Sequence, residues 1–381
     1  MIDYATGAEP GHSRPPKGAV RSAGDGEGAS RKHGVSAGTS AQPNVARAFA
    51  AGADEPRCAL KANGGYRPDL EPATQEFVDW VDASGARPFS ARSIEGVRKS
   101  LARLQSAPIG KPGASIKDVA LPAGPGRTIC ARIVRPKSAQ DPMPVVMFFH
   151  GGGWIAGDAN THDRLVREIA VGAHAAVVVV LYSRPPEAAF PLPIEEAYAA
   201  TVYVAEHAAS LNLDGTRLAV VGDGAGGNIA AGVAILAKRR HRPKLGLQVL
   251  FYPITGASFG TPSYLEWDSG PWLTRSDMEW LWNVYLPGAA ARQAVAATPL
   301  AATIDELRGL PETLLITAEA DVLRDEGEAY ARKLSQASVR TTCTRYIGTI
   351  HDFVMPNALA DTPAARAAIG QANTALRQSL A

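Results

Sequence analysis

Two residues in the C-terminal third of the chain have the types and spacing of an acid–base pair. Asp321 follows the apolar, β-prone run 313–317, and His351 follows a second such run, 341–347. A histidine just past a strand end can reach over a sheet as a general base, and a carboxylate past a neighbouring strand can fix its tautomer and stabilise the imidazolium. The chain has 8 histidines, so one histidine alone would be a weak signal. The prediction of an acid–base pair depends on both residues, each of which follows a predicted strand.

A run of three glycines follows an apolar segment earlier in the chain. Residues 144–149, PVVMFF, have the length and composition of a buried parallel strand, and residues 150–154, HGGGW, follow directly. Because glycine has no Cβ, the amides of Gly152 and Gly153 can approach a ligand and stabilise the oxyanion of a tetrahedral intermediate. An isolated run of this kind is more often a plain turn, so the oxyanion interpretation depends on the motif that follows.

Residues 220–228, VVGDGAGGN, indicate a strand that ends in a tight turn and opens a helix. This is the setting of the G-x-S-x-G nucleophile elbow, in which a serine hydroxyl stands at the top of a sheet. Gly224 occupies the serine position, and the amide of Ala225 would be a further oxyanion donor. The chain order of elbow, Asp321 and His351 is that of nucleophile, acid and base in α/β-hydrolases. The sequence therefore predicts an esterase-type site that lacks its nucleophile.

With these motifs in place, the chain resembles the hormone-sensitive-lipase-like family of α/β-hydrolases, the bacterial carboxylesterases of family IV. The matching segments are 150–154, 222–228, 321–327 and 351–353, and the resemblance runs from about residue 66 to the end. It implies an α/β-hydrolase fold with a helical cap, a carboxylic ester hydrolase for small acyl esters, and no cofactor or metal. Such esterases often dimerise through edge strands or terminal helices, so the resemblance also implies that a homodimer can form.

Two positions depart from the family's motifs. Gly224 replaces the serine, and without a hydroxyl there is no acyl-enzyme route. Asp352 replaces the usual glycine after His351, which places a carboxylate beside the base; we expect it to affect the pKa of the base and rank it as a minor change. The backbone should accept Gly224 readily, because the elbow conformation is strained for other residues. The fold survives the substitution and the serine chemistry does not.

Three interpretations of this combination remain open. The chain is a carboxylesterase whose serine has been replaced, or a non-hydrolytic relative that binds a small molecule as a sensor or carrier, or a lyase or cyclase in which His351 transfers protons over a retained oxyanion hole. Serine hydrolases without one triad member keep roughly 10³–10⁴-fold catalysis over water. The intact Asp321, His351 and glycine run favour an esterase scaffold with an ester-type ligand and absent or very weak hydrolysis, although acid and histidine alone do not separate the first interpretation from the third.

Strands and helices alternate through most of the chain. We expect strands near 144–149, 175–182, 217–221, 246–252, 313–317 and 341–347, and helices near 161–172, 193–208, 227–239, 325–337 and 362–378. Two amphipathic helices between 70 and 104 and a hairpin-like pair, 116–119 and 128–134, come first. This order predicts an α/β fold with a mostly parallel, doubly wound central sheet and a site at the carboxyl ends of its strands.

Two segments, about 66–108 and 257–295, stand outside the alternation, and the resemblance implies that they form the cap. The second holds four of the six tryptophans. We expect Trp267 and Trp272, together with Trp154 of the glycine run, to contact the substrate, although aromatic residues most often pack in cores.

Composition sets the remaining bounds. A formal net charge of +2 over 381 residues gives no electrostatic case for nucleic-acid or anionic-membrane binding, and no apolar run is long enough to span a membrane. The cysteines, at 58, 130 and 343, have no metal-ligand spacing and favour a reduced, cytoplasmic setting. Residues 1–65 are poor in Leu, Ile and aromatics and lack a secretory signal, so we expect a disordered N-terminal extension before an α/β-hydrolase domain at 66–381.

Overall fold

The computed structural model describes residues 69–381 apart from 86–87, 125, 138, 140–141 and 289–293. The extension predicted at 1–65 lies outside these residues. Within the described part, eight strands form one sheet in the order β1-β2-β4-β3-β5-β6-β7-β8. β1 and β2 pair antiparallel with each other and β2 with β4, whereas the pairs from β4 to β8 are all parallel. The predicted α/β-hydrolase fold with a mostly parallel sheet is confirmed.

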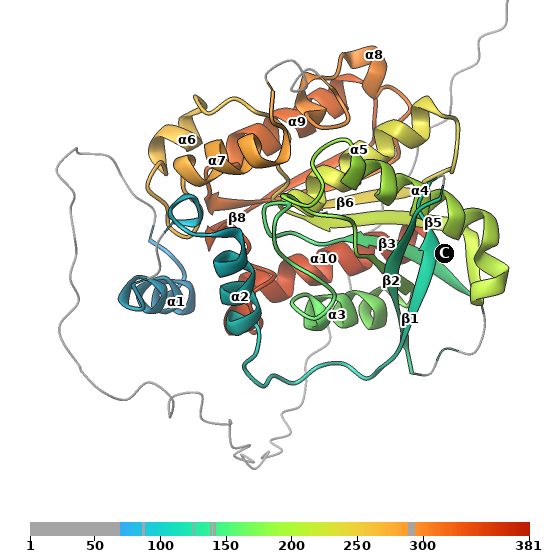
Figure 1. Cartoon of the computed structure of the whole chain (residues 1–381), viewed down its shortest axis with the longest axis horizontal. Coiled ribbons are helices and arrows are strands. Elements are labelled where there is room, and N and C mark those ends of the chain that lie inside the picture. The colour runs from blue at the N-terminus through green and yellow to red at the C-terminus, as the bar shows by residue number, and fades with distance from the viewer. Residues whose placement is uncertain (1–68, 86–87, 125, 138, 140–141, 289–293) are drawn as a thin grey trace, which may run out of the picture. The chain divides into compact units, whose positions relative to one another are not determined.

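The strands follow the expected positions closely. Their bounds are β1 Ala114–Pro122, β2 Thr128–Pro136, β3 Met143–Phe149, β4 Ala176–Val180, β5 Leu213–Asp223, β6 Leu247–Phe251, β7 Glu312–Ala320 and β8 Thr341–Ile350. Every residue of β3, β4 and β6 is buried, because helices cover both faces of a parallel sheet and leave no polar side. Figure 1 shows the carboxyl ends of the parallel strands gathered at the edge that faces α1, α2 and α7.

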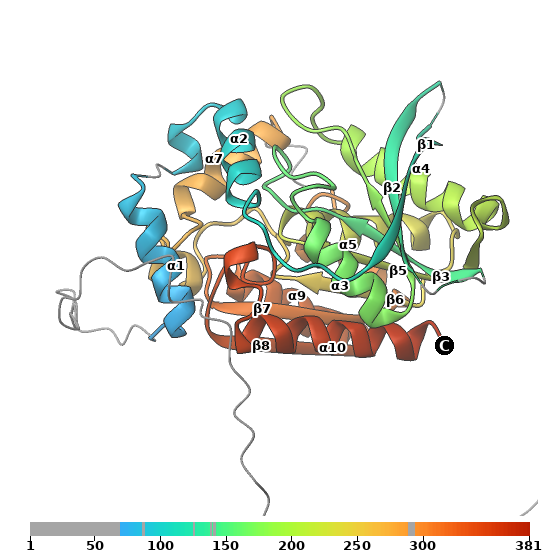
Figure 2. The same cartoon turned by 90° about the horizontal axis from the view of Figure 1, so that it is seen from below.

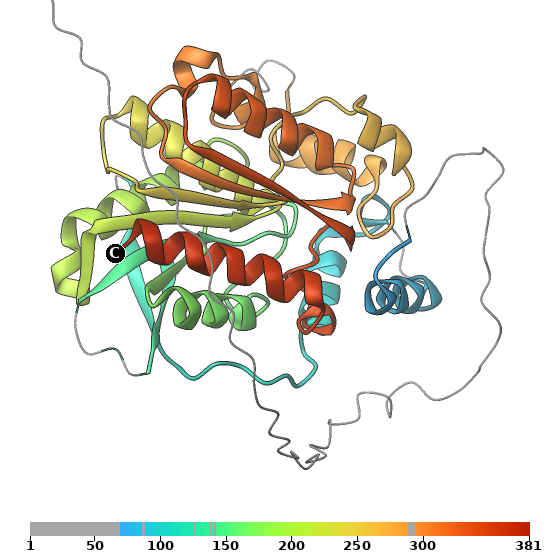
Figure 3. The same cartoon turned by 180° about the vertical axis from the view of Figure 1, so that it is seen from behind.

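Helices cover both faces of the sheet. α3 (Asp163–Ala173) and α10 (Pro363–Ser379) pack against each other on one face, as Figure 3 shows from behind. The other face carries α4 (Leu192–His207), α5 (Ala225–Arg239) and α9 (Arg324–Gln336), with the short α8 (Ile304–Leu307) beside α9. The described helices include none that is both long and apolar enough to cross a membrane.

The two segments outside the alternation lie near the carboxyl ends of the strands. The first forms α1 (Pro72–Ala83), a 3-10 turn η2 (Phe89–Ala91) and α2 (Ile94–Leu104), and the second forms α6 (Pro262–Glu266) and α7 (Arg275–Tyr285). Figure 2 shows α1, α2 and α7 grouped at one end of the sheet. α7 begins with a capping box between Thr274 and Asp277, and Asp277 also accepts the amide of Ser90 in η2 at 2.9 Å. Two predicted cap segments are thus joined through one buried carboxylate.

Candidate active site

Gly224 forms the whole turn between β5 and α5. Its φ of +52° and ψ of −113° lie in a region that favours glycine, and α5 begins at the next residue, Ala225. Its amide donates to the carbonyl of Phe251 at 3.0 Å, which ties the turn to the neighbouring strand β6. Two residues on, a Cβ at Gly226 would stand 1.9 Å from the carbonyl oxygen of Phe149. The glycine-rich elbow therefore follows from both a positive φ and a close approach of two backbones.

The structure brings the three predicted catalytic positions together. Asp321 directly follows β7 and His351 directly follows β8, and Oδ2 of Asp321 lies 2.8 Å from Nδ1 of His351. The other oxygen of Asp321 accepts the amide of Leu323 at 2.9 Å, so the carboxylate is held from both sides. A Cβ built on Gly224 would lie 3.4 Å from Nε2 of His351. A serine there would therefore place its hydroxyl in hydrogen-bond reach of the imidazole.

A second carboxylate stands at the opposite side of the imidazole. Oδ1 of Asp352 lies 3.4 Å from Nε2 of His351 and would lie 3.8 Å from a Cβ at Gly224, while its Oδ2 accepts the indole N–H of Trp272 at 3.0 Å. Asp352 has a φ of +68°, a left-handed conformation that Asp and Asn adopt more readily than other non-glycine residues. The side chain of Asp352 thus faces both His351 and the predicted nucleophile position, which the sequence alone does not show.

The charge on His351 depends on these two acids. Burial lowers the pKa of the imidazole, but the carboxylates of Asp321 and Asp352 outweigh it and raise the pKa to about 9. Burial also raises the pKa of Asp352, against the opposing effect of His351. The ring of Tyr252 packs edge-on against the imidazole with centroids 5.0 Å apart.

The glycine run forms a loop beside the elbow. Within the described part of the chain, the amides of Gly152, Gly153 and Ala225 donate to no other group. Unused amides at a helix N-terminus and in a glycine loop are the donors that an oxyanion hole needs. The amide of Gly151 is used instead to fix the loop, since it donates to Oδ1 of Asp223 at 3.0 Å.

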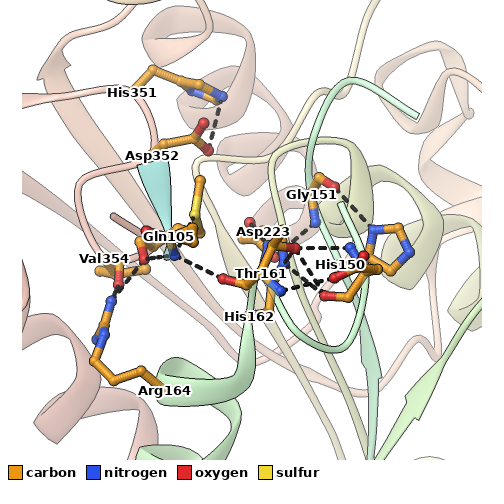
Figure 4. A network of polar contacts seen from close by, with 12 residues as sticks. Gln105, His150, Gly151, Thr161, His162, Arg164, Asp223, His351, Asp352 and Val354 are labelled. Carbon is orange, nitrogen blue, oxygen red and sulfur yellow. Dashed lines mark hydrogen bonds and ion pairs between the residues drawn. The ribbon is translucent and has the colours of Figure 1, made fainter. Parts of the chain in front are cut away.

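Asp223 anchors a buried network that sequence reasoning missed. Its Oδ2 lies 3.2 Å from Nε2 of His162, and both side chains are fully buried. Burial lowers the pKa of His162, but Asp223 reverses this and raises it. The hydroxyl of Tyr182 donates to the carbonyl of His150, on whose ring it stacks at 4.4 Å. Figure 4 shows Asp223 between His162 and Gly151, so this acid joins the elbow, the oxyanion loop and α3.

The segment after His351 is held by two polar side chains from other elements. The guanidinium of Arg164 in α3, which is buried, donates to the carbonyls of Val354 and Met355 at 2.7 and 2.8 Å. The amide of Gln105, at the end of α2, donates to Met355 and to Thr161 and accepts the backbone amide of Asn357. Figure 4 shows both side chains directed at this segment. The position of the imidazole is thus coupled to α3 and to α2.

The three predicted substrate-contacting tryptophans lie in different surroundings. Trp154 is fully buried and stacks on Tyr285 of α7 with centroids 4.2 Å apart, which is a packing position. Trp267 is also buried. Trp272 is half-buried, contacts Phe77 of α1 at 5.4 Å between centroids, and is joined to the site through Asp352. The structure therefore supports a place beside the ligand for Trp272 and gives no such support for the other two.

Comparison with known proteins agrees with this geometry. A family model described as the alpha/beta hydrolase fold matches residues 146–355. Carboxylesterase NlhH of Mycobacterium tuberculosis is 36% identical over 315 residues, covering 82% of this chain and 97% of that protein, and a putative alpha/beta hydrolase of Acanthamoeba polyphaga mimivirus is 38% identical over 312 residues, covering 80% and 89%. The crystal structure of a thermostable esterase from Pseudomonas putida superposes with a TM-score of 0.81 at 44% identity, covering 83% of this chain and 99% of that one.

The chain therefore belongs to the α/β-hydrolase family. Within it, the scaffold is that of the carboxylesterases, which confirms the hormone-sensitive-lipase-like resemblance. Among the residues that the structure covers, no group of three or more His, Cys, Asp and Glu side chains could hold a metal ion.

Proposed function

We propose that this chain carries the ester-binding site of a carboxylesterase for small acyl esters, and that it hydrolyses them very weakly or not at all because Gly224 replaces the nucleophile. One observation carries the proposal: the Cβ position of residue 224 lies 3.4 Å from Nε2 of His351, whose Nδ1 contacts Asp321. This supports a site that lacks only its hydroxyl. The names of the relatives, a carboxylesterase and an esterase, support an ester as the ligand class.

Each remaining group has a role in this proposal. Asp321 orients His351, and the amides of Gly152, Gly153 and Ala225 bind the carbonyl oxygen as it becomes negative. Removal of one such donor from a serine hydrolase costs roughly 3–4 kcal/mol of transition-state stabilisation, so the retained donors support a site that still stabilises the oxyanion of a reacting ester.

The proposal is tested by comparing this chain with its Gly224→Ser variant on p-nitrophenyl acetate and butyrate. We expect hydrolysis by the chain that is very weak beside the strong activity of the variant. A serine at a φ of +52° costs on the order of 1–3 kcal/mol, so circular dichroism must first show that the variant is folded. A folded variant without activity on either ester would contradict the proposal.

A further inference from the structure

We propose that Asp352 and His351 act as a serine-independent acid–base pair: Asp352 takes a proton from a water molecule that attacks the ester carbonyl, and His351 protonates the departing alcohol. The proposal rests on the proposed function, since it requires an ester bound beside Gly224. It accounts for the weak hydrolysis that this chain would retain and gives Asp352 a catalytic role.

The geometry around residue 224 supports this pairing. The heavy atoms nearest to a Cβ at Gly224, chain neighbours aside, belong to His351 and Asp352: Nε2 at 3.4 Å, Cε1 at 3.6 Å and Oδ1 at 3.8 Å. An attacking oxygen near this point therefore has room, and a small displacement brings it within hydrogen-bond distance of either side chain. It would start between a carboxylate and an imidazole, on the side of the elbow where a serine oxygen would attack.

The cap sets the orientation of the Asp352 carboxylate. The indole of Trp272 donates to Oδ2 at 3.0 Å, which leaves Oδ1 directed at Nε2 of His351. The indole is itself held, because Phe77 of α1 and Phe89 of η2 pack against it with centroids 5.4 and 6.4 Å away. The reactive oxygen of Asp352 is thus fixed by elements of both cap segments.

The pKa shifts of the two side chains suit these roles. Burial raises the pKa of Asp352, which makes it a stronger base than an exposed aspartate, although His351 opposes the shift. His351, whose pKa is lowered by burial and raised to about 9 by its two acids, carries a proton to donate. In a serine triad the imidazole must instead be neutral to accept the hydroxyl proton, so the roles of the two side chains differ from those in a serine esterase.

The reaction balances as the addition of water to an ester. The water oxygen forms a bond to the acyl carbon as its proton passes to Oδ1 of Asp352, and the carbonyl electrons move to the oxygen bound by the Gly152, Gly153 and Ala225 amides. The carbon–oxygen bond to the alcohol then breaks, and the alkoxide takes the proton on Nε2 of His351. The proton on Asp352 returns to His351, and the products are a carboxylic acid and an alcohol.

The first test compares hydrolysis rates near neutral pH for the chain and for Asp352→Asn, Trp272→Phe and Asp361→Asn. General acid–base groups contribute about 10²–10⁴-fold, so we expect Asp352→Asn to lower the residual rate by roughly 10²-fold. Asn adopts a positive φ as readily as Asp and can still accept the indole N–H, so this variant should fold. Trp272→Phe keeps an aromatic ring but removes the indole N–H, and should cause a smaller loss. The exposed Asp361 is the matched control and should change nothing.

A second measurement separates the two roles. The His351→Gln variant should lose more activity on ethyl butyrate, whose alkoxide must be protonated, than on p-nitrophenyl butyrate, whose phenolate leaves without a proton. A single turnover in ¹⁸O-labelled water should label the released acid and leave Asp352 unlabelled.

Two results would overturn the inference: a rate for Asp352→Asn that is not lower than that of the chain, or ¹⁸O in Asp352, which would make it a nucleophile. If Gly224→Ser is active while Asp352→Asn changes nothing in the Gly224 chain, the proposed function stands and this inference fails. If folded Gly224→Ser is inactive, the proposed function itself fails.

Discussion

Gly224 lies so close to His351 that a Cβ added to it would stand 3.4 Å from Nε2 of the imidazole. Nε2 of His351 therefore faces the point where the side chain of residue 224 would begin. The φ of +52° explains why glycine fits this turn without strain. The molecule thus combines a tight glycine turn with a buried imidazole that has no hydroxyl beside it at residue 224.

The pH dependence of Gly224→Ser should reveal the second carboxylate at His351. The base must be neutral to accept the serine proton, and its pKa is about 9 because Asp321 and Asp352 outweigh the effect of burial. We therefore expect kcat/KM to rise with pH up to about 9, well above the ordinary histidine value of 6.5. Adding Asp352→Asn removes one negative charge and should move the midpoint of the profile to lower pH. Identical midpoints with and without Asp352 would contradict this assignment.

Asp223 should be important for stability. Asp223→Asn keeps an acceptor for the amide of Gly151 but removes the charge that faces His162. Leaving a buried polar group without its hydrogen-bond partner costs about 1–3 kcal/mol, and we expect a loss of this size in the free energy of unfolding, measured with urea near neutral pH. Asp361→Asn, at an exposed turn, provides the control. Equal unfolding midpoints for the two variants would show that the pair contributes nothing.

Glu326 should make the fold less stable as pH rises. Burial raises the pKa of this carboxyl to about 8, although the amides of Thr255 and Gly256 oppose the shift. A carboxyl whose folded pKa is raised contributes stability fully below its unfolded pKa of 4.5 and loses it as pH approaches about 8. The loss is on the order of 1 kcal/mol per pH unit in this window. Glu326→Gln should therefore reduce the fall in melting temperature between pH 4.5 and about pH 8. If the melting temperature of the variant falls as steeply as that of the chain, groups other than Glu326 cause the fall.

Two glycine-to-alanine changes should have opposite effects. A Cβ at Gly226 would meet the carbonyl oxygen of Phe149 at 1.9 Å, so Gly226→Ala must move α5 away from β3. We expect this variant to lower the free energy of unfolding by about 3 kcal/mol or more, at the upper end of the usual cost of overpacking a core. A Cβ at Gly370, inside α10, meets nothing within 4 Å. Gly370→Ala should stabilise by roughly 0.5–1 kcal/mol. Similar unfolding midpoints for the two variants would contradict the tight elbow.

The elements were predictable because their signals are local. Hydrophobic runs fixed the strands within a few residues, although β5 begins earlier than expected, at Leu213, and α5 begins at Ala225 because one glycine completes the turn. The motif order was enough to place Asp321, His351 and Gly224 near one another.

The contacts that tune the site were not predictable from the sequence. His162 and Asp223 are 61 residues apart, and no motif pairs them. The sequence shows that Asp352 is next to His351, but its direction is set by a hydrogen bond from Trp272, 80 residues away, and by a positive φ. Trp154 belongs to a recognisable motif, yet its burial against Tyr285 depends on how α7 packs. Side-chain orientation in the site therefore required the tertiary structure.

The most direct test of the central claim is covalent labelling of residue 224. Diethyl p-nitrophenyl phosphate should be incubated with the chain, with Gly224→Ser, and with Gly224→Ser combined with His351→Gln, and the adducts located by peptide mass spectrometry. We predict one phosphoryl group per molecule on residue 224 of the single variant, much slower labelling without His351, and none in the chain itself. If the folded Gly224→Ser variant stays unlabelled at residue 224, a serine at this position is not activated by His351, and the central claim is wrong.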